Sequence, residues 1–247
     1  MKNEYTLVMG RHPVIEALQA HQSFNRVFLQ QGVRGPYESE IRQLCKAQTI
    51  PLQIIPKERF HKFTRANHQG VLGLLSPVAY QRLEDVLPLV YERSGNPLFV
   101  LLDGVTDTRN FGAIGRSAEL CGAHAVVLPL KNSVQITPDA IKTSAGALLQ
   151  LPVCREKNLL DAIKFLQMSG VRVFGSSLRT DHMVSEVDFT GPTALVLGSE
   201  ERGISREVTA LVDQPFKLPQ VGQTDSFNVS VAAGIMLYEV LRQRGRR

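Results

Sequence analysis

The residues best suited to chemistry lie in three polar segments that contain glycine, at 103–116, 198–204 and 218–234. The first two segments each follow an apolar run that reads as a β-strand, and the third begins where a further strand is expected to end. In open parallel sheets, ligands bind at the carboxyl ends of the strands. We therefore expect these segments to be where the protein binds a ligand.

The first segment joins a helix start to an arginine. Asp107 or Asn110 is suited to cap the helix, and Gly112 and Gly115 permit its close packing on neighbouring elements. Arg116 is expected about one turn into this helix, near the edge of the sheet. An arginine in that place is either a salt-bridge partner or a contact to an anion or a substrate, and the residue types favour neither.

The second segment directly follows an apolar run that ends at Leu197. Gly198 and Gly203 permit sharp turns and a close approach of the backbone to a ligand. The free N–H and C=O groups of such a loop are able to grip a flat heterocycle. A plain turn from strand to helix is the alternative interpretation.

The third segment runs from a strand through a loop into a helix. Ser226 or Asn228 is suited to cap that helix. The small side chains at 231–234 suit either tight packing or a dimer face. The polar residues before them favour a site at this helix start.

Alternating strands and helices must position these segments. From residue 98 onward this alternation indicates a parallel sheet that helices cover on both faces. The expected strands are 98–102, 125–128, 171–174 and 194–197, and the expected helices are about 112–122, 138–148, 157–168, 205–211 and 229–243.

A small α/β unit is expected at residues 1–78, followed by a linker at 79–97. The unit holds ten Lys and Arg but five Asp and Glu, whereas residues 79–247 hold eighteen of each. A basic unit beside a neutral one favours an anionic partner such as a nucleic acid, with a solvated basic face as the alternative. Within the unit, the expected helices are 12–18, 37–47 and 57–64, and the expected strands are 26–29, 52–55 and 71–75. A further helix is expected within the linker, at 83–91.

Composition and missing motifs exclude several classes of protein. No apolar run approaches the roughly 18 residues of a membrane helix, and the first residues lack the apolar core of a secretory signal. The sequence contains no G-x-G-x-x-G fingerprint, P-loop or G-x-S-x-G elbow. Three widely spaced cysteines and six scattered histidines predict no disulfide framework and no metal site, and we expect a cytoplasmic protein.

Taken together, the three polar segments resemble the signature motifs of the SpoU (TrmH-type) family of RNA 2'-O-ribose methyltransferases. The first resembles the N-x5-R motif, with Asn110 and Arg116. The second resembles the G-x-E-x-x-G motif that follows a strand, with Gly198, Glu200 and Gly203. The third resembles the P-x-x-G-x3-S-[hydrophobic]-N-V-S-x-A motif, with Pro219, Gly222, Ser226, Asn228 and Ser230. The departures are small: Phe227 stands where leucine is common, and the pair at 201–202 is Glu-Arg.

The first 78 residues resemble the small ribosomal-protein-like domain that precedes the catalytic domain in the 23S rRNA guanosine methyltransferase branch. The sequence GRHPVIEAL at 10–18 and the sequence HQGV at 68–71 carry this resemblance. The tRNA branch generally lacks the domain. The resemblance implies that the unit binds substrate RNA, and the candidate contacts to phosphates are Arg11, Arg59, Lys62 and Arg65.

The resemblance implies a trefoil-knotted α/β domain at 98–247, a homodimer, and S-adenosylmethionine bent into the knot. The implied donor contacts are Leu197, Gly198, Gly203, Leu218 and Phe227. The implied reaction is methyl transfer to a ribose 2'-hydroxyl, with a guanosine of 23S rRNA as the favoured target. A tRNA target and a non-catalytic RNA-binding ribosome-assembly factor are the alternatives.

The resemblance also assigns roles to the polar residues. Arg116 either handles the proton of the hydroxyl or stays charged, holds a phosphate and stabilises the developing alkoxide. Asn110 is expected to orient Arg116 or the ribose. Glu200, Ser226 and Asn228 are expected to fix the loops and the RNA, with a purely structural role as the alternative for Glu200.

Overall fold

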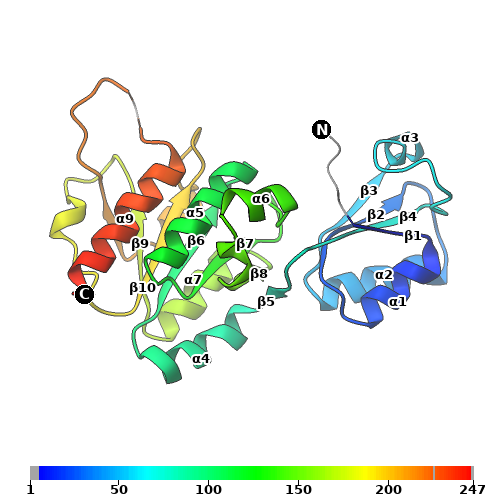
Figure 1. The fold of residues 1–247 in the computed structure, drawn as a ribbon, viewed down its shortest axis with the longest axis horizontal. Helices are drawn as coiled ribbons and strands as arrows, with labels where there is room; N and C mark the ends of the chain where they lie inside the picture. Colours follow the sequence, from blue (N-terminus) through cyan, green and yellow to red (C-terminus); the bar gives the residue numbers. More distant parts are fainter. Residues whose placement is uncertain (1–5, 225, 246–247) are drawn as a thin grey trace. The chain divides into compact units, whose positions relative to one another are not determined.

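The computed structural model describes residues 6–224 and 226–245, and the chain divides into two compact units. The first unit runs to Ala79 and also includes Gln135–Pro138. The second unit comprises Tyr80–Val134 and the chain from Asp139 onward. Figure 1 shows that each unit is built around its own sheet.

A four-stranded sheet forms the centre of the first unit, with the strand order β1-β4-β2-β3. β2 and β3 are parallel, and the other neighbours are antiparallel. The strands are β1 (Leu7–Met9), β2 (Phe24–Gln30), β3 (Leu52–Ile55) and β4 (Val71–Leu75), and the helices are α1 (Arg11–Gln19), α2 (Pro36–Ala47) and α3 (Lys57–Phe60).

Both faces of this sheet are buried, because apolar side chains along β2 alternate between them. Val27 and Leu29 pack in one cluster with the apolar faces of α1 and α2. Phe28 packs in the other cluster with Phe60 of α3. The short helix α3 is therefore anchored through Phe60, which is fully buried.

The predicted elements of the first unit are mostly confirmed. The helices at 12–18 and 37–47 and the three strands lie within two residues of their expected bounds. The predicted helix at 57–64 ends at Phe60 and continues as a turn. The edge strand β1 was not predicted, since three half-buried residues carry no periodic signal.

The second unit contains a seven-stranded sheet with the order β11-β9-β10-β6-β7-β8-β5. Every neighbouring pair is parallel, which confirms the predicted parallel sheet. The strands are β5 (Tyr80–Gln81), β6 (Leu98–Asp103), β7 (Ala125–Pro129), β8 (Val153–Glu156), β9 (Arg172–Ser176), β10 (Thr193–Gly198) and β11 (Gln214–Phe216).

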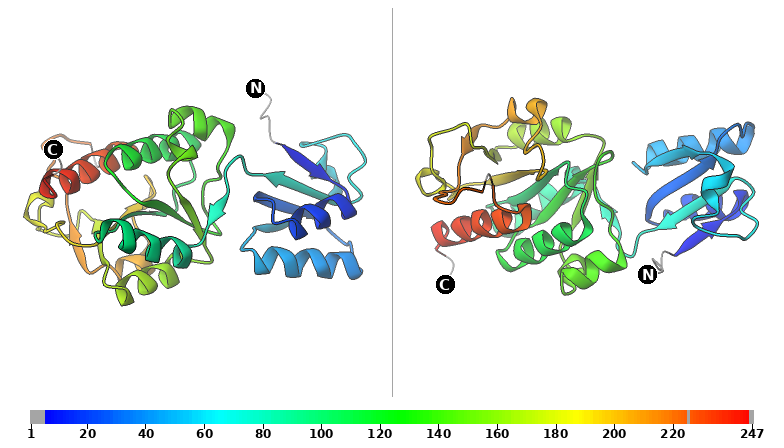
Figure 2. Two further views of the ribbon diagram at one scale, coloured as in Figure 1. Left: turned by 60° about the horizontal axis from the view of Figure 1, so that its bottom comes forward. Right: turned by 90° about the horizontal axis from the view of Figure 1, so that it is seen from above.

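Helices cover both faces of this sheet (Figure 2). On one face α5 packs along α9, and on the other α4, α7 and α8 pack over a common apolar core. The helices are α4 (Leu83–Ser94), α5 (Thr108–Leu120), α6 (Pro138–Thr143), α7 (Leu159–Met168), α8 (Arg206–Thr209) and α9 (Val229–Gln243), with short 3-10 helices η1 (Ala147–Leu149) and η2 (Val184–Glu186).

The expected linker at 79–97 differs from the structure, in which most of this segment belongs to the second unit. β5 pairs with β8, and α4 buries Leu83, Val86, Leu87 and Val90 in the core. The apolar spacing along α4 was the signal for this packing. The boundary between the units falls between Ala79 and Tyr80.

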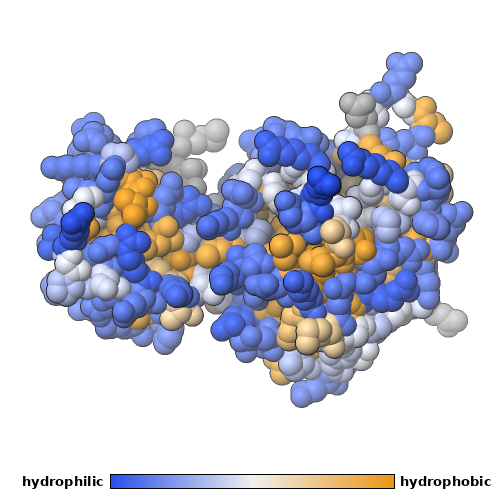
Figure 3. Space-filling model, turned by 180° about the vertical axis from the view of Figure 1, so that it is seen from behind, coloured by the Kyte–Doolittle hydropathy of each residue, from blue (hydrophilic) through white to orange (hydrophobic). Residues whose placement is uncertain are grey.

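No helix among the described residues is long and apolar enough to span a membrane. On the face shown in Figure 3, hydrophilic side chains surround separate apolar patches on both units.

Candidate active site

The register of the sheet brings two of the polar segments together. β10 pairs with β6 so that Gly198 lies opposite Asp103, and both strands end there. The chain after β6 leads into α5, and the chain after β10 forms a tight loop. The carboxyl edge of the sheet therefore holds the first and second segments side by side.

Three side chains, one from each polar segment, form a hydrogen-bonded group that we call the amide–carboxylate cluster: Asn110, Glu200 and Asn228. Asn110 Nδ2 donates to Glu200 Oε1 at 3.2 Å. Asn228 Nδ2 donates to the same carboxylate oxygen and to Asn110 Oδ1, the latter at 3.1 Å. Residues up to 118 positions apart in the sequence thus meet at one point.

Helix caps set the orientation of this cluster. Asp107 caps α5, because its side chain accepts from the Asn110 N–H at 2.8 Å. Asn228 caps α9, and its Oδ1 accepts from the N–H of Ser230 at 3.0 Å and from the Ser230 hydroxyl at 2.6 Å. Because the Asn228 oxygen is used in this way, its NH2 group must point toward Glu200 and Asn110.

The loop after β10 is closed on itself. Ser199 and Gly203 exchange backbone hydrogen bonds of 3.1 and 2.8 Å, and Gly203 has a φ of 66°. A Cβ on Gly198 would lie 2.0 Å from the carbonyl carbon of Gly203, so only glycine fits there. Sequence reasoning missed Asp103, whose carboxylate accepts from the N–H of Ser205 at 2.7 Å and ties the loop to β6.

Arg116 is exposed on α5 and lies outside the amide–carboxylate cluster. Because α5 begins at Thr108, Arg116 lies about two turns into the helix, and the expected single turn was wrong. Among the residues that the structure describes, no hydrogen bond or ion pair engages its guanidinium. The group is thus available to an anionic ligand.

The expected donor contacts lie at the ends of β10 and β11 and at the start of α9. Leu197 and Leu218 are buried, whereas Gly203 and Phe227 are exposed. In the described part of the chain, the Leu218 N–H and C=O groups find no hydrogen-bond partner. Ser226 is exposed, two residues before the Asn228 cap.

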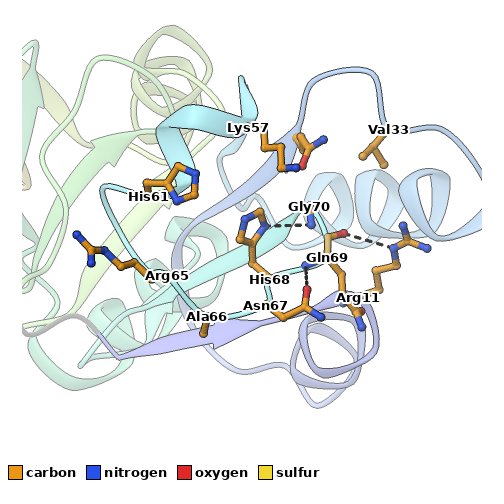
Figure 4. Close-up of a pocket in the computed structure, with 11 residues that line it drawn as sticks. Arg11, Val33, Lys57, His61, Arg65, Ala66, Asn67, His68, Gln69 and Gly70 are labelled. Atoms are coloured by element: carbon orange, nitrogen blue, oxygen red, sulfur yellow. Dashed lines mark hydrogen bonds between the residues drawn. The ribbon is translucent and has the colours of Figure 1, made fainter.

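A second candidate site lies within the first unit. Arg11 and Arg65 line a pocket of about 330 Å³, whereas Arg59 and Lys62 are not among its lining residues (Figure 4). Sequence reasoning missed the other charged and aromatic lining residues, which are Lys57, His61 and His68. The basic composition of 57–68 was a signal for Lys57 and His61, and the HQGV sequence at 68–71 was a signal for His68.

Two family models match this chain. The SpoU rRNA Methylase family matches residues 97–238. The RNA 2'-O ribose methyltransferase substrate-binding family matches residues 7–81.

Known proteins give a consistent result. A putative TrmH family tRNA/rRNA methyltransferase of Staphylococcus aureus is 37% identical over 98% of this chain and 97% of its own length. The SpoU methyltransferase AviRb of Streptomyces viridochromogenes, solved with the cofactor AdoMet, aligns with a TM-score of 0.60 and 25% identity over 96% of this chain and 90% of its own.

The A. aeolicus TrmH/SpoU tRNA-modifying enzyme aligns with a TM-score of 0.56 and 29% identity, but over only 66% of this chain and 84% of its own. The predicted family is confirmed by these matches together with the geometry of the three motifs. This chain belongs to the SpoU family of RNA methyltransferases.

Proposed function

We propose that this protein transfers a methyl group from S-adenosylmethionine to the ribose 2'-hydroxyl of a guanosine in 23S rRNA. The amide–carboxylate cluster carries the proposal, because it joins the N-x5-R, G-x-E-x-x-G and third motifs through direct hydrogen bonds. A cluster held on two helix caps and a closed loop suits a reaction whose main demand is alignment. Alignment of two reacting groups is worth roughly 7–11 kcal/mol.

The residues at the sheet edge fit S-adenosylmethionine as the methyl donor, in agreement with the AdoMet-bound relative. Its sulfonium supplies an electrophilic methyl group. Gly198 allows close backbone contact, and the unpaired N–H and C=O of Leu218 are suited to grip the adenine. We place Leu197, Gly198, Gly203, Leu218 and Phe227 around the donor, within the trefoil knot that the family implies.

Arg116 is proposed to remain charged during the reaction. Removing a proton from a guanidinium at neutral pH costs about 7.5–9 kcal/mol, which makes it a poor base. A charged Arg116 holds an RNA phosphate and stabilises the oxygen anion that forms as the hydroxyl loses its proton. Asn110 and Asn228, fixed by Glu200, position the ribose, and Ser226 contacts the RNA.

The first unit favours rRNA over tRNA as the target. It matches the substrate-binding family model, and the alignment with a tRNA-modifying relative covers only two thirds of this chain. A tRNA target remains the second candidate, because the curated relative is named for both RNAs.

An exposed apolar stripe on α9 supports a homodimer. Val231, Ile235 and Tyr238 are 49%, 37% and 63% exposed and follow one another at helical spacing. A monomer gains nothing from this stripe, whereas a second copy would remove it from water. We propose that α9 packs against its counterpart in the dimer.

Nucleoside analysis tests the proposed function. Unmodified 23S rRNA and unmodified tRNA are each incubated with the protein and labelled S-adenosylmethionine, digested, and separated into nucleosides. We expect labelled 2'-O-methylguanosine from 23S rRNA and none from tRNA. Label in tRNA alone would transfer the proposal to the second candidate, and a protein that does not bind the donor would be a non-catalytic RNA-binding factor.

A further inference from the structure

The pocket of the first unit is built from segments distant in the sequence. Its walls come from the start of α1, the end of β2 with the turn after it, the start of α3, and the loop at 61–70 (Figure 4). Its volume of about 330 Å³ lies within the range of small-molecule sites, which is roughly 300–1,000 Å³. The pocket is therefore large enough for one nucleotide and too small for a paired helix.

The charge of the lining selects for anions. Arg11, Lys57 and Arg65 line the pocket, and none of its lining residues is acidic. Among the described residues, none of these three cations forms an ion pair. A phosphate at the pocket mouth would meet positive side chains from three separate segments of the chain.

His68 provides a flat wall with a fixed orientation. Its ring stacks on the buried Phe60 ring at 4.3 Å with an angle of 9° between the planes. Its Nδ1 accepts from the N–H of Gly70 at 3.0 Å, so Nε2 carries the proton. Burial, with the charges of His61 and Lys57, lowers the pKa of His68 below its ordinary value, which leaves the ring neutral at pH 7.

The loop that carries His68 is held in an unusual backbone conformation. Gln69 has a φ of 50°, which is rare for a residue with a side chain. Its N–H donates to Asn67 Oδ1 at 3.3 Å, and its Oε1 accepts from the N–H of Arg11 at 3.3 Å. The Arg11 guanidinium in turn lies over the Tyr37 ring at 4.0 Å. Strain that several contacts enforce is typical of binding sites.

We propose that this pocket binds one unpaired nucleotide of the RNA, with its base against His68 and its phosphate held by Lys57 and Arg65. This inference rests on the proposed function, because it assumes an RNA substrate. Proteins read RNA sequence mainly from unpaired bases, which stack on aromatic and imidazole rings and offer free hydrogen-bonding edges. The amide side chains of Gln30, Asn67 and Gln69 supply polar groups for those edges. A phosphate alone would need neither the flat neutral ring nor a cavity of this volume.

Binding of matched RNA duplexes to the full-length protein tests the inference. The probes are a 12-base-pair RNA duplex, the same duplex with one bulged nucleotide (A, G, C or U), and the same duplex with an abasic bulge. The abasic probe has the same number of phosphates as the bulged probes. Affinity is measured by fluorescence anisotropy at one salt concentration, without methyl donor.

We expect at least one bulged base to bind about 5- to 150-fold more tightly than the abasic probe, which is the range for stacking of a base on a ring. His68→Ala should remove this preference and leave binding of the paired duplex within twofold. Lys57→Gln, on an exposed position, should reduce the preference without disturbing the loop. Arg59→Gln, a change of equal charge outside the pocket lining, should weaken all probes equally.

Three results would overturn the inference. If no bulged base exceeds the abasic probe, the pocket does not hold a nucleotide, although RNA binding and the proposed function stand. If both pocket variants keep the full preference, the bulge is read elsewhere on the protein. Absence of binding to every RNA would contradict both the inference and the RNA-binding role of the first unit.

Discussion

The two sites of this protein are built on opposite principles. In the amide–carboxylate cluster, Asn110, Glu200 and Asn228 come from three distant segments and satisfy one another through hydrogen bonds. In the pocket of the first unit, the cations Arg11, Lys57 and Arg65 surround an open space. The first arrangement fixes geometry, as methyl transfer requires, and the second attracts an anion.

This difference predicts how each site responds to substitution. Substitutions in the amide–carboxylate cluster should reduce the rate of the chemical step, because small displacements of the reacting groups lower that rate by large factors. Changes among the pocket cations should reduce RNA affinity in smaller, salt-dependent amounts.

Arg116→Ala should lower the rate of methyl transfer at saturating RNA by about 10²–10³-fold, the usual effect of losing one group that stabilises a developing oxygen anion. Arg116→Lys separates two forms of this role. If charge alone matters, lysine restores part of the rate, whereas bidentate holding of a phosphate does not tolerate it. Both variants should bind S-adenosylmethionine like the wild type in calorimetry, and a lost donor site would contradict this role.

Glu200→Ala should lower the rate by about 5- to 150-fold, because the Asn110 and Asn228 NH2 groups lose their shared acceptor at roughly 1–3 kcal/mol. Glu200→Gln keeps an acceptor oxygen and should retain most of the rate. The measurement is single-turnover methyl transfer, with thermal unfolding as the control for a structural role. Equal rates in the two variants, with unchanged stability, would show that the carboxylate does not position the amides.

Lys57→Gln and Arg65→Gln should each reduce the slope of log K against log salt concentration by about 0.7–0.9 for RNA binding, if each cation contacts one phosphate. Arg93→Gln, an exposed change on α4 of the second unit, is the matched control. Binding titrations at four salt concentrations give the slopes. Unchanged slopes in both pocket variants would remove the pocket from the RNA-binding surface.

Glu156→Gln should raise the melting temperature at pH 7, with the smallest effect of the series. Burial raises the pKa of Glu156 above its ordinary value of 4.5, although the Leu83 N–H and Arg82 oppose this. A raised carboxyl pKa contributes stability that is full below pH 4.5 and is lost as the pH rises through the folded-state value. In the structure, the Leu83 N–H donates to Glu156 Oε1 at 2.7 Å. Glutamine would keep an acceptor oxygen for this N–H without carrying the charge.

Thermal melts from pH 4 to 8 check this prediction. The gain from Glu156→Gln should shrink as the pH falls toward 4.5. Glu92→Gln, an exposed carboxylate on α4, should show no comparable pH dependence. A gain that grows at low pH would reverse the assigned sign.

The sequence predicted the parallel sheet and the family, because long apolar strands and three spaced motifs are strong local signals. It did not predict that Asp107 and Asn228, rather than their neighbours, cap the helices, since several polar residues at a helix start are equivalent by type. It placed α4 in a linker, because the sequence SGNP at 94–97 breaks a helix and is more conspicuous than the apolar face of α4.

For the candidate sites too, the sequence predicted single residues but not their arrangement in space. Asn110, Glu200 and Asn228 were identified singly, but their mutual hydrogen bonds depend on the strand register and could not be derived from spacing. In the first unit, cations were chosen by type, and two of the four, Arg59 and Lys62, fall outside the pocket lining. Which side of a short helix faces a cavity depends on packing around Phe60.

The central claim is that the second unit performs the chemistry and the pocket of the first unit recognises the RNA. Single-turnover methyl transfer, measured against the concentration of 23S rRNA, tests it most directly. We predict that Arg116→Ala lowers the plateau rate by about 10²–10³-fold, with only the small rise in the half-saturating RNA concentration that the loss of one phosphate contact causes. We predict that the double variant Lys57→Gln/Arg65→Gln raises the half-saturating concentration and keeps the plateau. A lowered plateau in the pocket variant, or a wild-type plateau in Arg116→Ala, would contradict this division of roles.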